Sequence, residues 1–203
     1  MESYVLFLFV LGAGLVLRVQ EERARIEHLG AALRPYRIEG LMETLADGYL
    51  RALGEADLDR REQVWNALEA TEASLVRDLR QFAADLARAP LGDFSFSSLP
   101  VSLPYATRLF PGATIDLRRL VAVHAEGIER VAANADGLER HRRAFVMTAE
   151  IYLLQHSCHW YCKSRPVASA RLVRRHQTAY EQVVASVSPE TRSAYLALLS
   201  RKG

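Results

Sequence analysis

The sequence predicts an all-α fold: a bundle of about six to seven helices with a short hydrophobic N-terminal helix and one long loop rich in aromatic residues and proline. Three observations predict it. Strand-like alternation is nearly absent, whereas stretches rich in Glu, Arg, Ala and Leu are frequent. Apolar residues in the middle of the chain recur at spacings of three and four. The 203 residues are enough for one domain with a buried core.

The N-terminal segment Tyr4–Leu17 contains fourteen residues without a charge. A bilayer-spanning helix needs roughly 20 apolar residues, with about 17 as the lower limit, so residues 1–20 form a short candidate membrane anchor. A cleaved signal peptide is disfavoured because Met-Glu-Ser offers no basic residue at the start and Arg18-Val19-Gln20 replaces the small residues of a cleavage site. The other alternative is a helix buried in a soluble cytoplasmic protein or between copies of the chain.

Basic residues follow this segment and none precedes it. Arg18, Arg23 and Arg25 lie close behind it, whereas Glu2 is the only charged side chain before it. The positive-inside rule then places the N-terminus outside and residues 21–203, the helical-bundle domain, in the cytoplasm. Arginine outnumbers lysine by 24 to two, a composition typical of a GC-rich bacterial genome, so the expected location is the inner membrane.

Proline and glycine divide the next part of the chain into helices. The helix that begins in the anchor continues over residues 18–34 and ends at Pro35. A second helix is expected over residues 38–53, with Gly54 just after its end. A third covers residues 57–88 and carries the clearest periodicity. An apolar stripe along this helix, interrupted by one acidic residue, predicts that a partner helix packs against it. The stripe consists of Leu58, Trp65, Leu68, Glu72, Leu75, Leu79, Phe82 and Leu86.

Residues 90–113 are expected to form a loop of about 24 residues, long enough to indicate a functional role. The loop could plug the open end of the bundle, cover an apolar pocket, or dock another protein. The candidate interaction residues are Phe94, Phe96, Leu99, Tyr105 and Phe110.

Four helices are expected to complete the chain. Asp116 opens one that runs to Ala133, and the Asn-Ala-Asp-Gly stretch breaks the chain before another over residues 138–163. Pro166 begins a helix that extends to Val187. The Ser-Pro-Glu sequence at 188–190 opens the last.

The segment 156–162 holds two imidazoles and two thiols, ligands that suit a transition metal: His156, Cys158, His159 and Cys162. On a helix, Cys158 and Cys162 share a face while His156 pairs separately with His159. All four therefore cannot bind one ion unless the helix unwinds. The simpler interpretation is that Cys158 packs in the core, because it continues an apolar stripe through Met147, Ile151, Leu154 and Tyr161.

The charge is unevenly distributed. Residues 163–203 carry eight basic and two acidic side chains, whereas the first 162 residues carry 18 basic and 22 acidic ones. Arg171, Arg174 and Arg175 share one helical face and form a candidate basic patch. Such a patch suits anionic lipid or a solvated surface. Nucleic acid is not an expected partner, because no binding module or interleaved aromatic residues accompany the patch.

The sequence contains no Gly-rich phosphate loop, no GxSxG and no HExxH motif, so no residue is predicted to be catalytic. The leading hypothesis is a membrane-anchored helical-bundle regulator or adaptor that binds another protein or a second copy of itself. The first alternative is a metal- or cofactor-binding sensor that uses the 156–162 cluster, although no cofactor is predicted outright. The second is a helical enzyme with an apolar pocket under the 90–113 loop.

Overall fold

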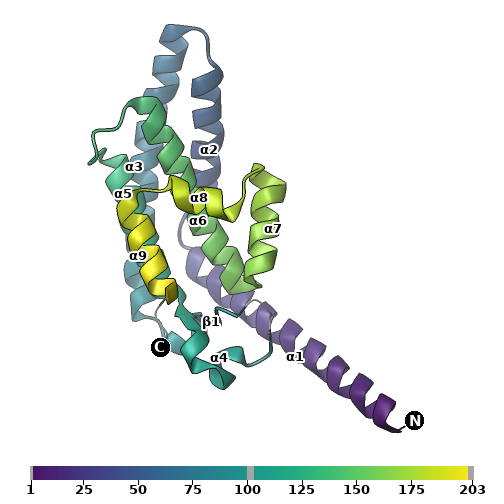
Figure 1. Cartoon of the computed structure of the whole chain (residues 1–203). Helices are drawn as coiled ribbons and strands as arrows, with labels where there is room; N and C mark the ends of the chain where they lie inside the picture. Colours follow the sequence, from purple (N-terminus) through teal and green to yellow (C-terminus); the bar gives the residue numbers. More distant parts are fainter. Residues whose placement is uncertain (1, 100–102, 201–203) are drawn as a thin grey trace.

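A computed structural model of the chain describes residues 2–99 and 103–200 and confirms the all-α fold (Figure 1). The long helices stand side by side as a bundle, and the first helix leaves its lower end obliquely. The elements of the described residues are α1 (Glu2–Leu33), α2 (Ile38–Gly54), α3 (Leu58–Arg88), η1 (Leu91–Phe94), β1 (Ser95–Ser97), α4 (Ala106–Leu109), η2 (Pro111–Ala113), β2 (Thr114–Asp116), α5 (Leu117–Ala132), α6 (Arg140–Cys162), α7 (Arg165–His176), α8 (Tyr180–Ser186) and α9 (Pro189–Ser200).

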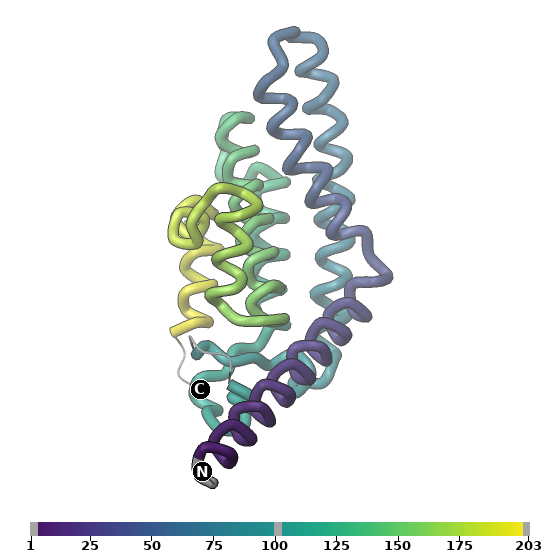
Figure 2. Tube along the Cα trace, turned by 90° about the vertical axis from the view of Figure 1, so that its right-hand side faces the viewer, coloured from purple at the N-terminus to yellow at the C-terminus, as the bar shows by residue number. Residues whose placement is uncertain are grey.

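Helices α2 and α3 form an antiparallel hairpin that reaches beyond the rest of the bundle (Figures 1 and 2). Asp57 caps α3 by accepting a hydrogen bond from the Arg60 backbone N–H at 2.8 Å. Every predicted member of the α3 stripe from Trp65 to Leu86 is buried. Leu58 is the exception: it lies at the tip of the hairpin and is exposed, so its prediction as a stripe residue was wrong.

The segment expected to be a loop contains short regular elements. Strands β1 and β2 pair antiparallel, with Phe96 opposite Ile115, a pairing that the near absence of strand signals did not predict. Both strands have three residues, too few for an alternating pattern to be visible in the sequence. Phe96 and Ile115 are buried, so the small ribbon closes one end of the bundle.

Helices α5 and α6 form the centre of the molecule. Asp116 caps α5 through a hydrogen bond from the Arg118 backbone N–H at 2.9 Å, as its position in the sequence predicted. Helix α6 packs against α5, α7 and α8, and its predicted stripe of Met147, Ile151, Leu154 and Tyr161 is buried.

The helix expected over residues 166–187 is two helices. Helix α7 ends where Gln177 adopts a left-handed conformation with φ 52° and ψ 31°. The Gln177 N–H donates a hydrogen bond to the Val173 carbonyl at 3.0 Å. The chain then turns into α8, which buries Tyr180, Val183 and Val184 against the bundle. No glycine or proline marks this break, so the sequence did not predict it.

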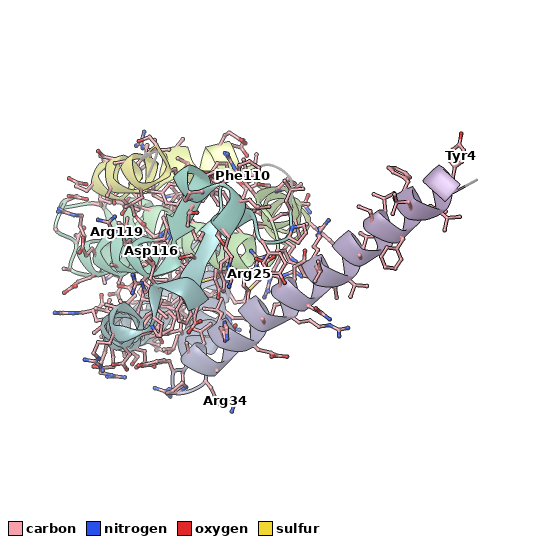
Figure 3. The ribbon with its side chains drawn as sticks, turned by 90° about the horizontal axis from the view of Figure 1, so that it is seen from below. Tyr4, Arg25, Arg34, Phe110, Asp116 and Arg119 are labelled. Atoms are coloured by element: carbon pink, nitrogen blue, oxygen red, sulfur yellow. The ribbon has the colours of Figure 1, made fainter. Side chains whose placement is uncertain are left out.

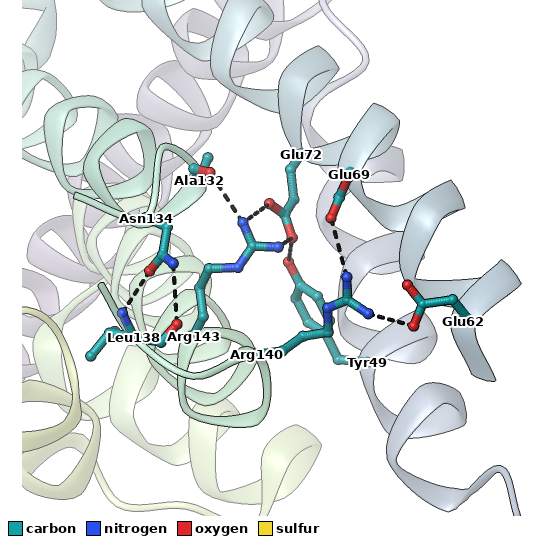
Figure 4. Close-up of polar contacts among 9 residues, drawn as sticks. All are labelled: Tyr49, Glu62, Glu69, Glu72, Ala132, Asn134, Leu138, Arg140 and Arg143. Carbon is teal, nitrogen blue, oxygen red and sulfur yellow. Dashed lines mark hydrogen bonds and ion pairs between the residues drawn. The ribbon is translucent and has the colours of Figure 1, made fainter. Parts of the chain in front are cut away.

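An ionic cluster joins the top of α6 to α2, α3 and α5 (Figure 4). The Arg143 guanidinium lies 3.2 Å from a Glu72 carboxylate oxygen and donates to the Ala132 carbonyl at 3.1 Å. The Tyr49 hydroxyl donates to the other Glu72 oxygen at 2.7 Å. Glu72 is the acidic residue that interrupts the α3 stripe, and these two donors allow it to be buried there.

Candidate functional sites

Helix α1 is divided between a half that projects from the bundle and a half that packs on it (Figures 1 and 3). In the projecting half, every large apolar side chain from Tyr4 to Leu17 is exposed. The packed half contains buried Glu22 and Leu29 and contacts α6, η1 and α3. Among the described residues, α1 alone is long and apolar enough to cross a membrane, and none of its apolar window is buried.

Two carboxylates hold the packed half of α1 against the bundle, just beyond the apolar run. Buried Glu22 accepts hydrogen bonds from Arg18 in its own helix at 2.9 Å and from Lys163 at the end of α6 at 2.6 Å. Glu21 accepts from the backbone N–H of Tyr105 at 3.1 Å. The residues around α4 are therefore fixed beside α1 one helical turn past Leu17.

The sequence placed five residues of the 90–113 segment on an interaction surface, and the structure separates them. Phe94 and Phe96 are buried: Phe94 stacks on Tyr161 at 6.0 Å between ring centroids, and Phe96 meets Trp160 edge-on at 5.4 Å. Leu99 is half-buried. Tyr105 and Phe110 are exposed, so these two remain available for contact with a partner.

The exposed pair belongs to a larger apolar surface around α4. Leu103, Tyr105, Leu109 and Phe110 are each between 41% and 65% exposed. The Arg108 guanidinium lies over the Tyr105 ring at 5.6 Å. We call these five residues the α4 surface. Figure 3, which views the molecule from below, labels its member Phe110.

The four metal-capable residues of α6 point to different neighbours. His156 is buried beside α7 and α8, where its Nε2 lies 3.1 Å from the Ser169 hydroxyl and its ring packs on Tyr180 at 4.5 Å. Cys158, His159 and Cys162 line a groove that does not include His156, although His159 also lies beside His156 in a second groove. Among residues 2–99 and 103–200, no three His, Cys, Asp or Glu side chains are grouped as metal ligands. The hypothesis of a metal sensor that uses His156, Cys158, His159 and Cys162 thus stays a prediction.

Burial disfavours the charged forms of these side chains. It raises the pKa of the Cys158 thiol to about 12 and that of the Cys162 thiol to about 11, so both are protonated at neutral pH. Burial, with Arg165 and His159 nearby, lowers the pKa of His156 to about 4. Cys158 and Cys162 are half-buried and pack against the core, and with protonated thiols neither is an activated nucleophile.

The groove has a volume of about 410 Å³ and lies between α1, α2, α3 and α6. Apolar side chains such as Leu29, Met42 and Phe82 line it, and the Arg175–Glu43 ion pair at 3.3 Å spans its rim. It does not lie under the 90–113 segment, where the expected enzyme pocket would be. The hollow there, lined by Leu99, Leu103 and residues of α1 and α6, measures about 10 Å³.

The predicted basic patch lies on α7. Arg171, Arg174 and Arg175 are exposed, and together with His156, His159 and His176 they line a second groove of about 400 Å³ between α6 and α7. Arg175 is neutralised in part by Glu43. Helices α7 and α4 lie apart in Figure 1, so the patch and the α4 surface are separate surfaces.

The tip of the α2–α3 hairpin is an apolar surface that the sequence analysis missed. Leu50, Leu53 and Leu58 are between 44% and 69% exposed. The signal for two of them was available, because Leu50 and Leu53 lie outside the helical stripe formed by buried Leu45, Tyr49 and Ala52. We call these three residues the leucine tip. It lies at the end of the molecule farthest from the projecting half of α1 (Figure 1).

No protein-family model, no curated protein and no solved structure matches this chain.

Proposed function

We propose that the protein is a single-pass, membrane-anchored helical bundle that acts as a regulator or adaptor by binding another protein in the cytoplasm. One observation carries the anchor: the large apolar side chains in the projecting half of α1 are all exposed, while the charged half is fixed to the bundle by Glu22. Exposing so much contiguous apolar surface to water is unfavourable, and a bilayer is the environment that removes the cost.

The length of the apolar run suits a thin or locally thinned bilayer. From Ser3 to Val19 a helix rises about 25 Å, against a hydrocarbon core of about 30 Å. Arg18 can extend the span by placing its guanidinium among the headgroups. With Arg18, Arg23 and Arg25 on the bundle side, the positive-inside rule supports an outside N-terminus and a cytoplasmic bundle.

The leucine tip supports the protein-binding part of the proposal. In this orientation the α2–α3 hairpin carries three exposed leucines away from the membrane, where a cytoplasmic partner or a second copy can reach them. Exposed apolar clusters of this kind are typical of protein-binding surfaces.

An arginine within the apolar run tests the anchor. Leu11→Arg places a charge near the middle of the span, which costs about 2.5–3.5 kcal/mol of insertion free energy. We expect the wild type to stay in the membrane pellet through a sodium carbonate wash, with its first 20 residues retained by intact mass, and Leu11→Arg to move largely to the supernatant. Leu50→Arg, at an exposed leucine of the tip, is the matched control and should stay in the pellet.

Recovery of the wild type in the carbonate supernatant, as a soluble oligomer or otherwise, would contradict the anchor. Loss of the first 20 residues from the mature protein would instead favour a cleaved signal and equally reject it.

A photo-crosslinking amino acid tests the partner surface. Introduced at Leu53 of the tip, it should give a discrete adduct in intact cells, whereas the same group at exposed Glu126 on α5 should not. An adduct of twice the chain mass would identify a second copy as the partner. Equal labelling from both positions, or none from Leu53, would contradict a role for the tip.

A further inference from the structure

The α4 surface lies at the level where α1 would leave the membrane. The Tyr105 N–H bond to Glu21 fixes this level, because Glu21 follows Leu17 by four residues, or about 6 Å along the helix. A headgroup layer is about 5–7 Å thick on each side of the hydrocarbon core. Figures 1 and 2 agree that α4 lies at the end of the bundle from which the apolar half of α1 projects.

The side chains of the α4 surface are those that favour a membrane interface. Tyr105 and Phe110 supply aromatic rings, Leu103 and Leu109 supply aliphatic surface, and Arg108 supplies a cation beside the tyrosine ring. Amphipathic aromatic side chains concentrate at headgroup level, and basic side chains there attract anionic lipids.

The backbone around Tyr105 holds this arrangement. Tyr105 adopts φ 55° and ψ 23°, a left-handed conformation that is unfavourable for a residue with a Cβ atom. The bond from its N–H to Glu21 and the capping bonds from the N–H groups of Arg108 and Leu109 to its carbonyl secure the turn. The turn keeps the Tyr105 ring exposed instead of letting it join Phe94 and Phe96 in the core.

We propose that the α4 surface, Leu103, Tyr105, Arg108, Leu109 and Phe110, inserts into the headgroup region of the anionic leaflet that faces the bundle, as a second contact beside the α1 anchor. This inference rests on the proposed anchor. A single helix leaves the bundle free to rotate and tilt at the membrane. A second contact fixed to α1 through Glu21 would hold the bundle at one angle and keep the leucine tip directed away from the lipid.

Tryptophan quenching by brominated lipid tests the contact in the full-length protein. Phe110→Trp is reconstituted into vesicles of phosphatidylcholine and phosphatidylglycerol with bromine atoms high on the acyl chains. Phe9→Trp, within the apolar half of α1, reports the anchor, and Leu58→Trp, at the leucine tip, reports an exposed position far from it. The native Trp65 and Trp160 are buried, and the wild type gives their background.

We expect the emission of Phe110→Trp to be blue-shifted and quenched at least half as strongly as that of Phe9→Trp. The brominated lipid should quench the emission of Leu58→Trp no more than it quenches that of the wild type. Replacing phosphatidylglycerol by phosphatidylcholine should weaken the quenching of Phe110→Trp and leave that of Phe9→Trp unchanged. Leu109→Trp repeats the measurement if Phe110→Trp lacks the near-UV dichroism of the folded wild type.

The outcomes separate the two proposals. Quenching of Phe9→Trp without quenching of either Phe110→Trp or Leu109→Trp would overturn the α4 contact and leave the anchor in place. Absence of quenching at Phe9→Trp would overturn the anchor, and the α4 contact with it. Equal quenching at Leu58→Trp would show that the bundle lies flat on the membrane and would overturn the proposed orientation.

Discussion

Glu72 and Arg143 show how a buried charge is accommodated in this bundle. Burial raises the pKa of Glu72, while the hydrogen bond from Tyr49 and the charge of Arg143 act in the opposite direction. The pair is almost fully buried, and it connects residues 71 positions apart in the sequence. It therefore fixes which turn of α6 lies against which turn of α3.

Removing one member of this pair should be far more harmful than removing both charges. Arg143→Met leaves Glu72 buried without its cation, and we expect a loss of about 3–5 kcal/mol in the free energy of unfolding. Adding Glu72→Gln should recover most of the loss, because the amide oxygen still accepts from Tyr49. The measurement is urea unfolding of the detergent-solubilised protein.

Arg140→Met is the control and should lower the free energy of unfolding by less than about 1 kcal/mol, because Arg140 pairs with Glu62 at the surface. Equal losses in Arg143→Met and Arg140→Met would refute the argument.

Glu150 is a buried carboxylate that forms no ion pair among the described residues. Its Oε1 accepts from the Ser188 backbone N–H at 3.0 Å and the Ser188 hydroxyl at 2.8 Å, and within residues 2–99 and 103–200 Oε2 has no hydrogen-bond partner. Burial is the largest influence and raises the pKa of Glu150 above its usual value of 4.5. The folded state therefore holds the proton of Glu150 to a higher pH than the unfolded state does.

This difference predicts a pH-dependent stability. As the pH rises above 4.5, the unfolded chain loses the proton first, so Glu150 lowers the free energy of unfolding until the folded carboxyl also ionises. At pH 4 the free energy of unfolding of Glu150→Gln should not exceed that of the wild type. As the pH rises, it should increase relative to the wild type by about 1.4 kcal/mol for each unit by which the pKa of Glu150 differs between the folded and unfolded states. Glu126→Gln, at an exposed carboxylate, is the control: its free energy of unfolding in urea should depend on pH between 4 and 8 in the same way as that of the wild type. Parallel curves for Glu150→Gln as well would show that burial does not control this carboxyl.

Between elements, α5 approaches α6 and α9 closely at Gly127. A Cβ atom at this position would lie 2.2 Å from the Thr191 hydroxyl oxygen and 2.8 Å from Glu150 Oε2, distances at which the neighbours must move. Gly127 thus allows three helices to meet around the Glu150–Ser188–Thr191 hydrogen bonds. Its role is close packing, since its backbone conformation is helical.

Gly127→Ala should consequently destabilise the bundle by about 1–3 kcal/mol, the usual cost of forcing extra volume into a packed core, even though alanine favours helices. Gly40→Ala in α2 is the matched control. No atom of the described residues lies within 4 Å of the added methyl group, so the free energy of unfolding of this variant should stay level or rise by up to about 1 kcal/mol. Thermal unfolding of both variants compares them. A stabilised Gly127→Ala would mean that α5 and α9 are not packed as described.

Helix α1 combines two environments in one uninterrupted element. Its charged half makes buried contacts through Glu22 and Leu29, whereas its apolar half buries no residue within the part of the chain that the structure describes. Because the helix is continuous from Glu2 to Leu33, the direction of the apolar half is set by the way the charged half packs on α6. The element thus couples the proposed anchor rigidly to the bundle.

At the scale of the whole molecule, the proposed topology makes a prediction for labelling in cells. A single cysteine in place of exposed Ala135, in the α5–α6 loop, should react with a membrane-impermeant maleimide only after lysis, because the bundle is expected in the cytoplasm. Cys158 and Cys162 are replaced by serine in this variant to remove background. Labelling of intact cells at Ala135→Cys would reverse the topology.

Local signals along the chain determined most of the helices and the apolar N-terminal run. The α3 stripe, the caps at Asp57 and Asp116 and the stop at Pro35 each depend on residues within a few positions of one another, so the sequence contains them in full. The separation of the segment 90–113 into buried Phe94 and Phe96 and exposed Tyr105 and Phe110 was decided only by the tertiary structure. So were the break at Gln177, the partners of Glu72 and the direction of α1. These features arise from contacts between residues that are distant in sequence, such as the hydrogen bond from the Tyr161 hydroxyl to the Asp93 carbonyl, 68 positions away. Whether a side chain is buried depends on what packs against it in space rather than on its neighbours in sequence.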